Sequence, residues 1–188
     1  MASPTQTVRI IGGKWRSRRI QFANLPTLRP TQDRIRETLF NWLMPFLKGA
    51  TCLDLFAGSG ALGFEALSRG ARFTCFVDQH PEVLHEIALN AKQLAIDSDQ
   101  FAIIQGDCPE QVPALPQAPF DIIFLDPPFS LNLCPETIDW LIKNEYTHAG
   151  SIIYLETERT NDCCLPDGWH TYRKKETKAL VYQLIQKD

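Results

Sequence analysis

The sequence predicts an α/β protein whose central sheet is mostly parallel. Between residues 51 and 156, short apolar stretches typical of buried strands alternate with stretches that have helical spacing. A glycine-containing turn joins the first of these strands to the first helix, and several strands end in an aspartate. In open sheets of this kind, the carboxyl ends of the strands form the edge where ligands bind.

Two segments precede the alternating region. Residues 8–11 and 18–22 are expected to pair as a small β-hairpin. A helix is expected from Thr31 to about Leu47, with Thr31 as its N-terminal cap and Pro45 ending or bending it. We expect this hairpin and helix to pack on the main domain as an extension.

The main domain is expected to contain five strands and three helices before a final hairpin. The strands are expected at residues 51–56, 71–78, 101–107, 122–125 and 151–156. The helices are expected at residues 60–69, 81–95 and 135–145. A closing hairpin is expected from residues 172–175 and 179–185.

The turn after the first of these strands has the spacing of a nucleotide-binding turn. Gly58, Gly60 and Gly63 satisfy G-x-G-x-x-G between a strand and a helix. Glycine lets the backbone approach a ligand closely, and the start of a helix presents N–H groups. Asp78 ends the next strand about 20 residues later, where an acidic side chain typically binds ribose hydroxyls. An NAD site would use these same features.

The apolar run 122–125 ends in Asp126-Pro127-Pro128-Phe129, the most informative stretch of the chain. Proline cannot continue a central strand, so Asp126 should lie at the strand's carboxyl end. An ionised carboxylate and the carbonyls of a proline step only accept hydrogen bonds, and an aromatic ring offers a face for stacking. These groups suit a flat ligand that carries an NH₂ group. Taken alone, the stretch also fits a simple proline-rich turn.

Together, the glycine turn and the Asp-Pro-Pro-Phe stretch resemble the Rossmann-like S-adenosylmethionine-dependent methyltransferases that act on exocyclic amino groups. The segments Arg9–Arg16 and Arg29–Leu43 resemble the leading segments of the bacterial RsmD family. That resemblance spans nearly the whole chain. It implies methylation of the 2-amino group of a guanine in small-subunit (16S) ribosomal RNA. It also implies a mostly parallel seven-stranded sheet with a C-terminal antiparallel hairpin.

The resemblance and the chemistry of the side chains assign roles to two sets of residues. The catalytic set is expected to be Asp126, Pro127, Pro128 and Phe129. The S-adenosylmethionine-binding set is expected to be Asp54, Phe56, Ala57, Gly58, Gly60, Asp78, Gly106 and Asp107. Asp54 could hold the cofactor's ammonium group or bond the N–H groups of its own turn. Asp107 should accept from the adenine amino group, with Gly106 allowing close approach.

Charge is distributed unevenly along the chain. The net charge is −3, yet residues 1–48 hold nine basic and two acidic residues. We therefore expect a basic N-terminal extension, residues 1–48, on an acidic methyltransferase domain, residues 49–188. A basic segment of this kind suits a phosphate backbone. The expected RNA contacts are Lys14, Trp15, Arg16, Arg18, Arg19, Arg29 and Arg34. For Trp15, stacking on RNA and burial in the core are weighted equally.

The remaining composition restricts the setting of the protein. No stretch is apolar enough to span a membrane, and the polar start lacks a hydrophobic signal segment, so we expect a cytoplasmic protein. The six cysteines have no C-x-x-C pair, which favours reduced thiols over a metal site, and no role is expected for Cys163 and Cys164. The expected partner is ribosomal RNA within a small-subunit assembly particle.

Three other classes of function remain open from the sequence. The same Asp-Pro-Pro-Phe chemistry could methylate adenine N6 in DNA or a glutamine amide in a protein. An NAD-dependent oxidoreductase would explain the glycine turn and Asp78, but it gives no reason for Asp126-Pro127-Pro128-Phe129. A non-catalytic RNA-binding protein could keep the fold.

Overall fold

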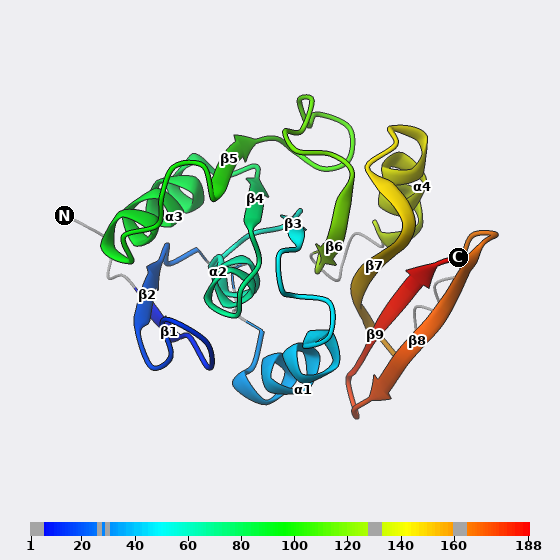
Figure 1. Cartoon of the computed structure of the whole chain (residues 1–188), viewed down its shortest axis with the longest axis horizontal. Coiled ribbons are helices and arrows are strands. Elements are labelled where there is room, and N and C mark those ends of the chain that lie inside the picture. Colours follow the sequence, from blue (N-terminus) through cyan, green and yellow to red (C-terminus); the bar gives the residue numbers. More distant parts are fainter. Residues whose placement is uncertain (1–5, 26–27, 29–30, 128–132, 160–164) are drawn as a thin grey trace.

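The computed structural model describes residues 6–25, 28, 31–127, 133–159 and 165–188. Its main feature is a seven-stranded sheet in the order β5-β4-β3-β6-β7-β9-β8, accompanied by a separate two-stranded sheet formed by β1 and β2. Figure 1 shows the β1/β2 hairpin (blue) and the β8/β9 hairpin (orange and red) at opposite ends of the view.

The elements follow the predicted alternation. The strands are β1 Gln6–Arg9, β2 Arg19–Phe22, β3 Thr51–Asp54, β4 Phe73–Asp78, β5 Phe101–Gln105, β6 Phe120–Leu125, β7 Thr147–Glu158, β8 Trp169–Glu176 and β9 Leu180–Lys187. The helices are α1 Asp33–Leu43, α2 Ala61–Ser68, α3 Pro81–Gln93 and α4 Cys134–Lys143.

The sheet has the predicted topology. Strands β5, β4, β3, β6 and β7 pair in parallel, whereas β9 pairs antiparallel with both β7 and β8. The predicted α/β fold, with a mostly parallel seven-stranded sheet and an antiparallel C-terminal hairpin, is therefore confirmed. Because parallel strands run in one direction, the carboxyl ends of β3, β4, β5, β6 and β7 meet at one edge.

Strand β6 lies at the centre of the core. Its residues Ile122, Ile123, Phe124 and Leu125 are fully buried, as expected for a strand covered on both faces. Side chains on one face of the sheet pack with α4, and those on the other face pack with α1 and α2. This packing fixes the position of β6 and therefore of Asp126, which follows its last residue.

The N-terminal region packs on the sheet domain by two routes. The β1/β2 hairpin shares an apolar cluster with α2 and α3, and α1 shares another cluster with β3 and β6. The expected hairpin and helix are present and packed on the core. The domain boundary between residues 48 and 49 stays a prediction.

One local expectation is wrong. Helix α1 begins at Asp33 and ends at Leu43, so it is shorter at both ends than the expected Thr31–Leu47 helix. Gln32 occupies the cap position, with no side-chain cap hydrogen bond. Thr31 lies too early to cap the helix, and its hydroxyl instead donates to Asp126.

Within the described ranges, no helix is long and apolar enough to cross a membrane.

Candidate active site

The predicted acidic residues gather at the carboxyl edge of the sheet. Asp54 is the last residue of β3, Asp78 is the last residue of β4, and Asp126 follows β6 directly. The pairing of β3 with both β4 and β6 brings these three strand ends side by side. Asp107 lies two residues beyond β5 on the outer part of the same edge and is exposed.

The glycine turn has backbone geometry that a larger residue would strain. Gly58 and Gly60 have φ values of 51° and 71°, in the left-handed region that favours glycine. At Gly63, an added Cβ would lie 2.2 Å from the ring of Phe76, so glycine lets α2 pack closely on β4. Beside these glycines, Phe56 is half-buried and Ala57 is buried. The predicted turn is therefore formed as expected, between β3 and α2.

The N–H groups of this turn are already bonded to the protein's own carboxylates. The Gly58 N–H donates to Asp78 Oδ2 at 2.9 Å, and the Gly63 N–H donates to Asp54 Oδ2 at 3.0 Å. In nucleotide-binding sites, N–H groups at the start of the helix receive a pyrophosphate. Here two carboxylates occupy that environment, which makes it unsuited to an anionic group and suited to a cationic one.

The two carboxylates differ in environment. Asp54 is buried, and burial raises its pKa to about 7, although the hydrogen bond from Gly63 opposes the shift and the charge of Asp78 adds to it. Asp78 also accepts from the backbone N–H of His80 at 2.9 Å and lies 3.0 Å from His80 Nδ1. The sequence left two partners open for Asp54, the cofactor's ammonium group and the N–H groups of its own turn. The structure shows the second of these.

Glycine is needed at position 106 for packing within the protein, whereas the sequence suggested that it allows close approach of the cofactor. A Cβ at this position would lie 2.8 Å from the carbonyl oxygen of Gln111. Glycine is therefore required by the close return of the chain's own 107–112 loop, whether or not a cofactor also approaches. The exposed side chain of Asp107 begins this loop.

Asp126 is the centre of the predicted catalytic set. Its Oδ2 accepts a hydrogen bond from the hydroxyl of Thr31 at 3.1 Å. Burial raises the pKa of Asp126 well above its ordinary value; the charges of Glu156 and Asp54 raise it further, and the Thr31 hydrogen bond opposes the shift. Pro127 is buried beside it. Pro128 and Phe129 lie outside the described residues.

Glu156 is a site residue that the sequence reasoning missed. It lies on β7, one residue beyond the Leu125–Leu155 pair, and Asp126 follows Leu125 directly after β6. Its side chain is buried and accepts a hydrogen bond from the hydroxyl of Tyr154 at 2.6 Å. Burial raises the pKa of Glu156, and the Tyr154 hydrogen bond opposes that shift. The edge therefore holds two adjacent carboxyl groups that compete for protons.

The predicted RNA contacts divide into exposed and buried residues. Lys14, Arg16, Arg18, Arg19 and Arg34 are exposed, and Arg29 lies outside the described residues. Trp15 is only 6% exposed and packs in the cluster under the hairpin, which favours the core interpretation. Its expected role in stacking on RNA is therefore corrected to a structural one. Large aromatic side chains carry enough apolar surface for burial to prevail.

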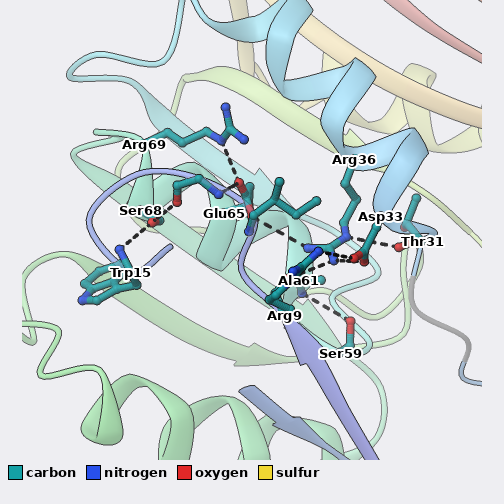
Figure 2. Close-up of polar contacts among 12 residues, drawn as sticks. Arg9, Trp15, Thr31, Asp33, Arg36, Ser59, Ala61, Glu65, Ser68 and Arg69 are labelled. Carbon is teal, nitrogen blue, oxygen red and sulfur yellow. Dashed lines mark hydrogen bonds and ion pairs between the residues drawn. The ribbon is translucent and has the colours of Figure 1, made fainter. Parts of the chain in front are cut away.

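A buried polar network docks the hairpin on α2 (Figure 2). The Glu65 carboxylate, fully buried on α2, accepts from the N–H groups of Ile11 at 2.7 Å and Gly12 at 2.8 Å. It also pairs with Arg69 at 2.7 Å and with Arg36 at 3.7 Å. Sequence reasoning placed Glu65 on a helix but gave it no role. The sequence did contain a sign of this role, because Glu65 is an acidic residue among apolar and small residues of the predicted helix.

Comparison with known proteins identifies the family. A family profile described as "Conserved hypothetical protein 95" matches residues 8–186. The chain belongs to this family. Curated relatives are named ribosomal RNA small subunit methyltransferase D. The relative from Haemophilus influenzae is 41% identical over 180 residues, covering 95% of this chain and 93% of its own. The relative from Escherichia coli K12 is 40% identical over 182 residues, covering 96% and 90%.

Structural comparison agrees with the family assignment. A solved structure from Escherichia coli is 37% identical, covers 97% of this chain and 99% of its own, and has a TM-score of 0.84. The resemblance to the RsmD family, inferred from the sequence, is thereby confirmed.

The described cysteines are buried and are not grouped with other metal-binding side chains. In the part of the chain that the structure describes, no group of three or more histidine, cysteine or acidic residues could hold a metal ion. Cys52, Cys75 and Cys108 are buried, and burial raises the pKa of each thiol, to about 12 for Cys75 and Cys108. These thiols therefore stay protonated and unreactive. Cys163 and Cys164 lie outside the described residues.

Proposed function

We propose that this family member transfers the methyl group of S-adenosylmethionine to the exocyclic 2-amino group of a guanine in 16S ribosomal RNA. The observation that carries the proposal is the position of Asp126, an acceptor carboxyl at the carboxyl end of β6, the strand that pairs with β3 where β3 leads into the glycine turn. The names of the curated relatives support the ribosomal RNA substrate.

The edge of the sheet suits the proposed cofactor. S-adenosylmethionine supplies an electrophilic methyl group on a positively charged sulfur and also carries an ammonium group, a ribose and an adenine. Asp54, at the end of the strand that leads into the turn, suits the ammonium group; Asp78 suits the ribose hydroxyls, and Asp107 suits the adenine amino group. A pyrophosphate would meet Asp54 and Asp78 at the start of α2, which argues against NAD.

The protein's contribution to methyl transfer is to orient the amino nitrogen. A guanine 2-amino nitrogen is a weak nucleophile because its lone pair is delocalised into the ring. Asp126 and the Pro127 carbonyl would each accept one of its hydrogens and favour a pyramidal nitrogen with its lone pair directed at the methyl carbon. With S-adenosylmethionine bound, the nitrogen–carbon bond would form as the sulfur–carbon bond breaks, the sulfur would leave as a neutral thioether, and the methylated nitrogen would lose one proton to the Asp126 carboxylate or to water. Phe129 is proposed to stack on the base, which must leave its helix to reach this edge.

The exposed basic residues of the hairpin loop support an RNA substrate. Lys14, Arg16 and Arg18 lie on the hairpin loop, and Arg19 begins β2; the loop is docked on α2, the helix that begins at the glycine turn. These basic residues and the carboxyl edge of the sheet therefore belong to one packed unit. We propose that the RNA is bound within a small-subunit assembly particle, and a cytoplasmic location follows from that substrate.

Asp126→Ala tests the acceptor role. We expect turnover with ribosomal RNA to fall about 100-fold or more, because the acceptor acts mainly in the transition state. Asp126→Asn keeps an acceptor oxygen and should retain part of the activity. Calorimetry should show that both variants bind S-adenosylmethionine nearly as well as the wild type, with no binding of NAD. Near-normal turnover in Asp126→Ala would show that the proposed hydrogen bond is wrong.

A further inference from the structure

We propose that Thr31 is a positioning residue for Asp126, and that the buried Arg36 holds Thr31 in place. This inference deepens the proposed function and rests on it. It assigns a physical task to the segment before α1, which resembled the RsmD family in sequence but received no role in the chemistry.

The contact that carries the inference joins two distant parts of the chain. The Thr31 Oγ1 donates to Asp126 Oδ2 at 3.1 Å across 95 residues of sequence. The rotation of an aspartate side chain is poorly fixed unless one of its oxygens is held. The Thr31 hydroxyl holds Oδ2, so the other carboxyl oxygen can be directed at the substrate amino group. A hydrogen bond to the ionised form also favours that form.

Arg36 fixes the backbone of Thr31. Its Nε donates to the carbonyl of Thr31 at 3.2 Å, and one terminal nitrogen donates to the carbonyl of Arg9 at 2.9 Å and to Asp33 at 2.6 Å. The Arg36 side chain is only 1% exposed, so this fork has a fixed geometry. Glu65, also buried, balances its charge from 3.7 Å. Figure 2 shows the guanidinium between Thr31, Asp33, Arg9 and Glu65.

The surroundings of Asp126 explain why a neutral donor is needed there. Glu156 and Tyr154 face Asp126 from β7, and Asp54 faces it from β3. The negative charges of Glu156 and Asp54 disfavour the ionised form of Asp126. Burial disfavours it as well. Thr31 acts in the opposite direction, because its hydroxyl stabilises the carboxylate. Removing this hydroxyl should both loosen Asp126 and keep it protonated to a higher pH.

The test compares Thr31→Val, Thr31→Ser and a matched control. Valine has nearly the shape of threonine but lacks the hydroxyl, whereas serine keeps it. Thr38→Val is the control, because the Thr38 hydroxyl donates only to the carbonyl of Arg34 within α1, at 3.0 Å. Turnover numbers and Michaelis constants for RNA and S-adenosylmethionine would be measured across pH, and folding would be compared by thermal unfolding.

For Thr31→Val, we expect kcat to fall about tenfold near neutral pH, the size expected for one lost hydrogen bond to a charged group. The rising limb of the pH profile should move to higher pH. Both Michaelis constants should stay close to the wild-type values. Thr31→Ser should recover most of the activity, and Thr38→Val should behave as the wild type. A merely structural role would lower the unfolding temperature without moving the pH profile.

Failure of this inference can be separated from failure of the proposed function by including Asp126→Ala. If Asp126→Ala loses turnover while Thr31→Val matches Thr38→Val in kcat and pH profile, the role of Thr31 is wrong and the proposed chemistry stands. If the wild type and Asp126→Ala methylate RNA equally, the proposed function itself is overturned.

Discussion

At the scale of single residues, the site is a set of carboxyl groups with different tasks. Asp54 and Asp78 are bonded to the N–H groups of the glycine turn, and Asp126 is held by a hydroxyl. Glu156 lies on the neighbouring strand β7, one residue beyond the partner of Leu125, and accepts a hydrogen bond from Tyr154. Ionising one of two neighbouring carboxyls makes ionising the other harder, so the charge of Glu156 adds to burial in raising the pKa of Asp126.

Glu156→Gln should extend activity to lower pH. Asp126 must be ionised to accept the amino hydrogens, and burial together with the charge of Glu156 raises its pKa. Glutamine removes that charge and keeps an acceptor for Tyr154, so the pKa of Asp126 should fall towards its ordinary value. The rising limb of kcat against pH should then move to lower pH. Glu158→Gln, an exposed change on the same strand, is the control. A rising limb that stays in place would contradict the coupling.

The sequence was sufficient to predict the site residues that lie at the ends of strands. Asp54, Asp78 and Asp126 could be predicted because each follows an apolar run, and parallel strands bring such positions together. Thr31 could not be predicted, because its contact spans 95 residues and no local pattern marks it. Glu156 was missed because it ends the fifth predicted strand without a turn motif to draw attention to it.

At the scale of elements, the hairpin is fixed to α2 by more than apolar packing. Gly13 has a φ of 76°, and an added Cβ would lie 1.9 Å from the carbonyl oxygen of Ser68. The Ser68 hydroxyl donates to the Gly12 carbonyl at 2.6 Å and accepts from the Trp15 N–H at 2.9 Å. Together with Glu65, these bonds hold the loop that presents Lys14, Arg16 and Arg18.

If the hairpin loop contacts phosphates, Arg16→Ala with Arg18→Ala should weaken RNA binding and reduce its salt dependence. Each lost contact should reduce the slope of log K against log salt by up to about 0.9 for a duplex, and less for single strands. Calorimetry should show unchanged S-adenosylmethionine binding. Lys175→Ala with Lys178→Ala, exposed at the far β8/β9 hairpin, is the control. An unchanged slope in the arginine variant would show that the loop is only a solvated face.

Element types could be predicted well, and element ends less well. The order of strands and helices was correct because the apolar periodicity is strong in each. The ends of α1 were wrong because capping depends on tertiary contacts: the Thr31 hydroxyl bonds Asp126 and not a helical N–H group. The docking of the hairpin on Glu65 also depends on a contact across more than 50 residues, which periodicity cannot reveal.

At the scale of the whole molecule, the N-terminal region and the edge of the sheet carry different charges. The exposed basic residues of the N-terminal region lie on the hairpin loop, β2 and α1, whereas Asp54, Asp78 and Asp126 lie at the carboxyl edge of the sheet. We propose that RNA bound to these basic residues presents one base to the acidic edge of the sheet, where the cationic cofactor would bind. Family resemblance was necessary to predict the guanine, because a carboxyl acceptor would serve adenine or an amide equally well.

Methylation of a guanine 2-amino group in 16S ribosomal RNA is tested most directly by mass spectrometry of nucleosides from that RNA. The RNA would come from cells that lack the protein, with wild type or Asp126→Ala restored. We predict that one N2-methylguanosine is lost without the protein, returns with the wild type and stays absent with Asp126→Ala. An unchanged N2-methylguanosine content in cells without the protein would contradict the account.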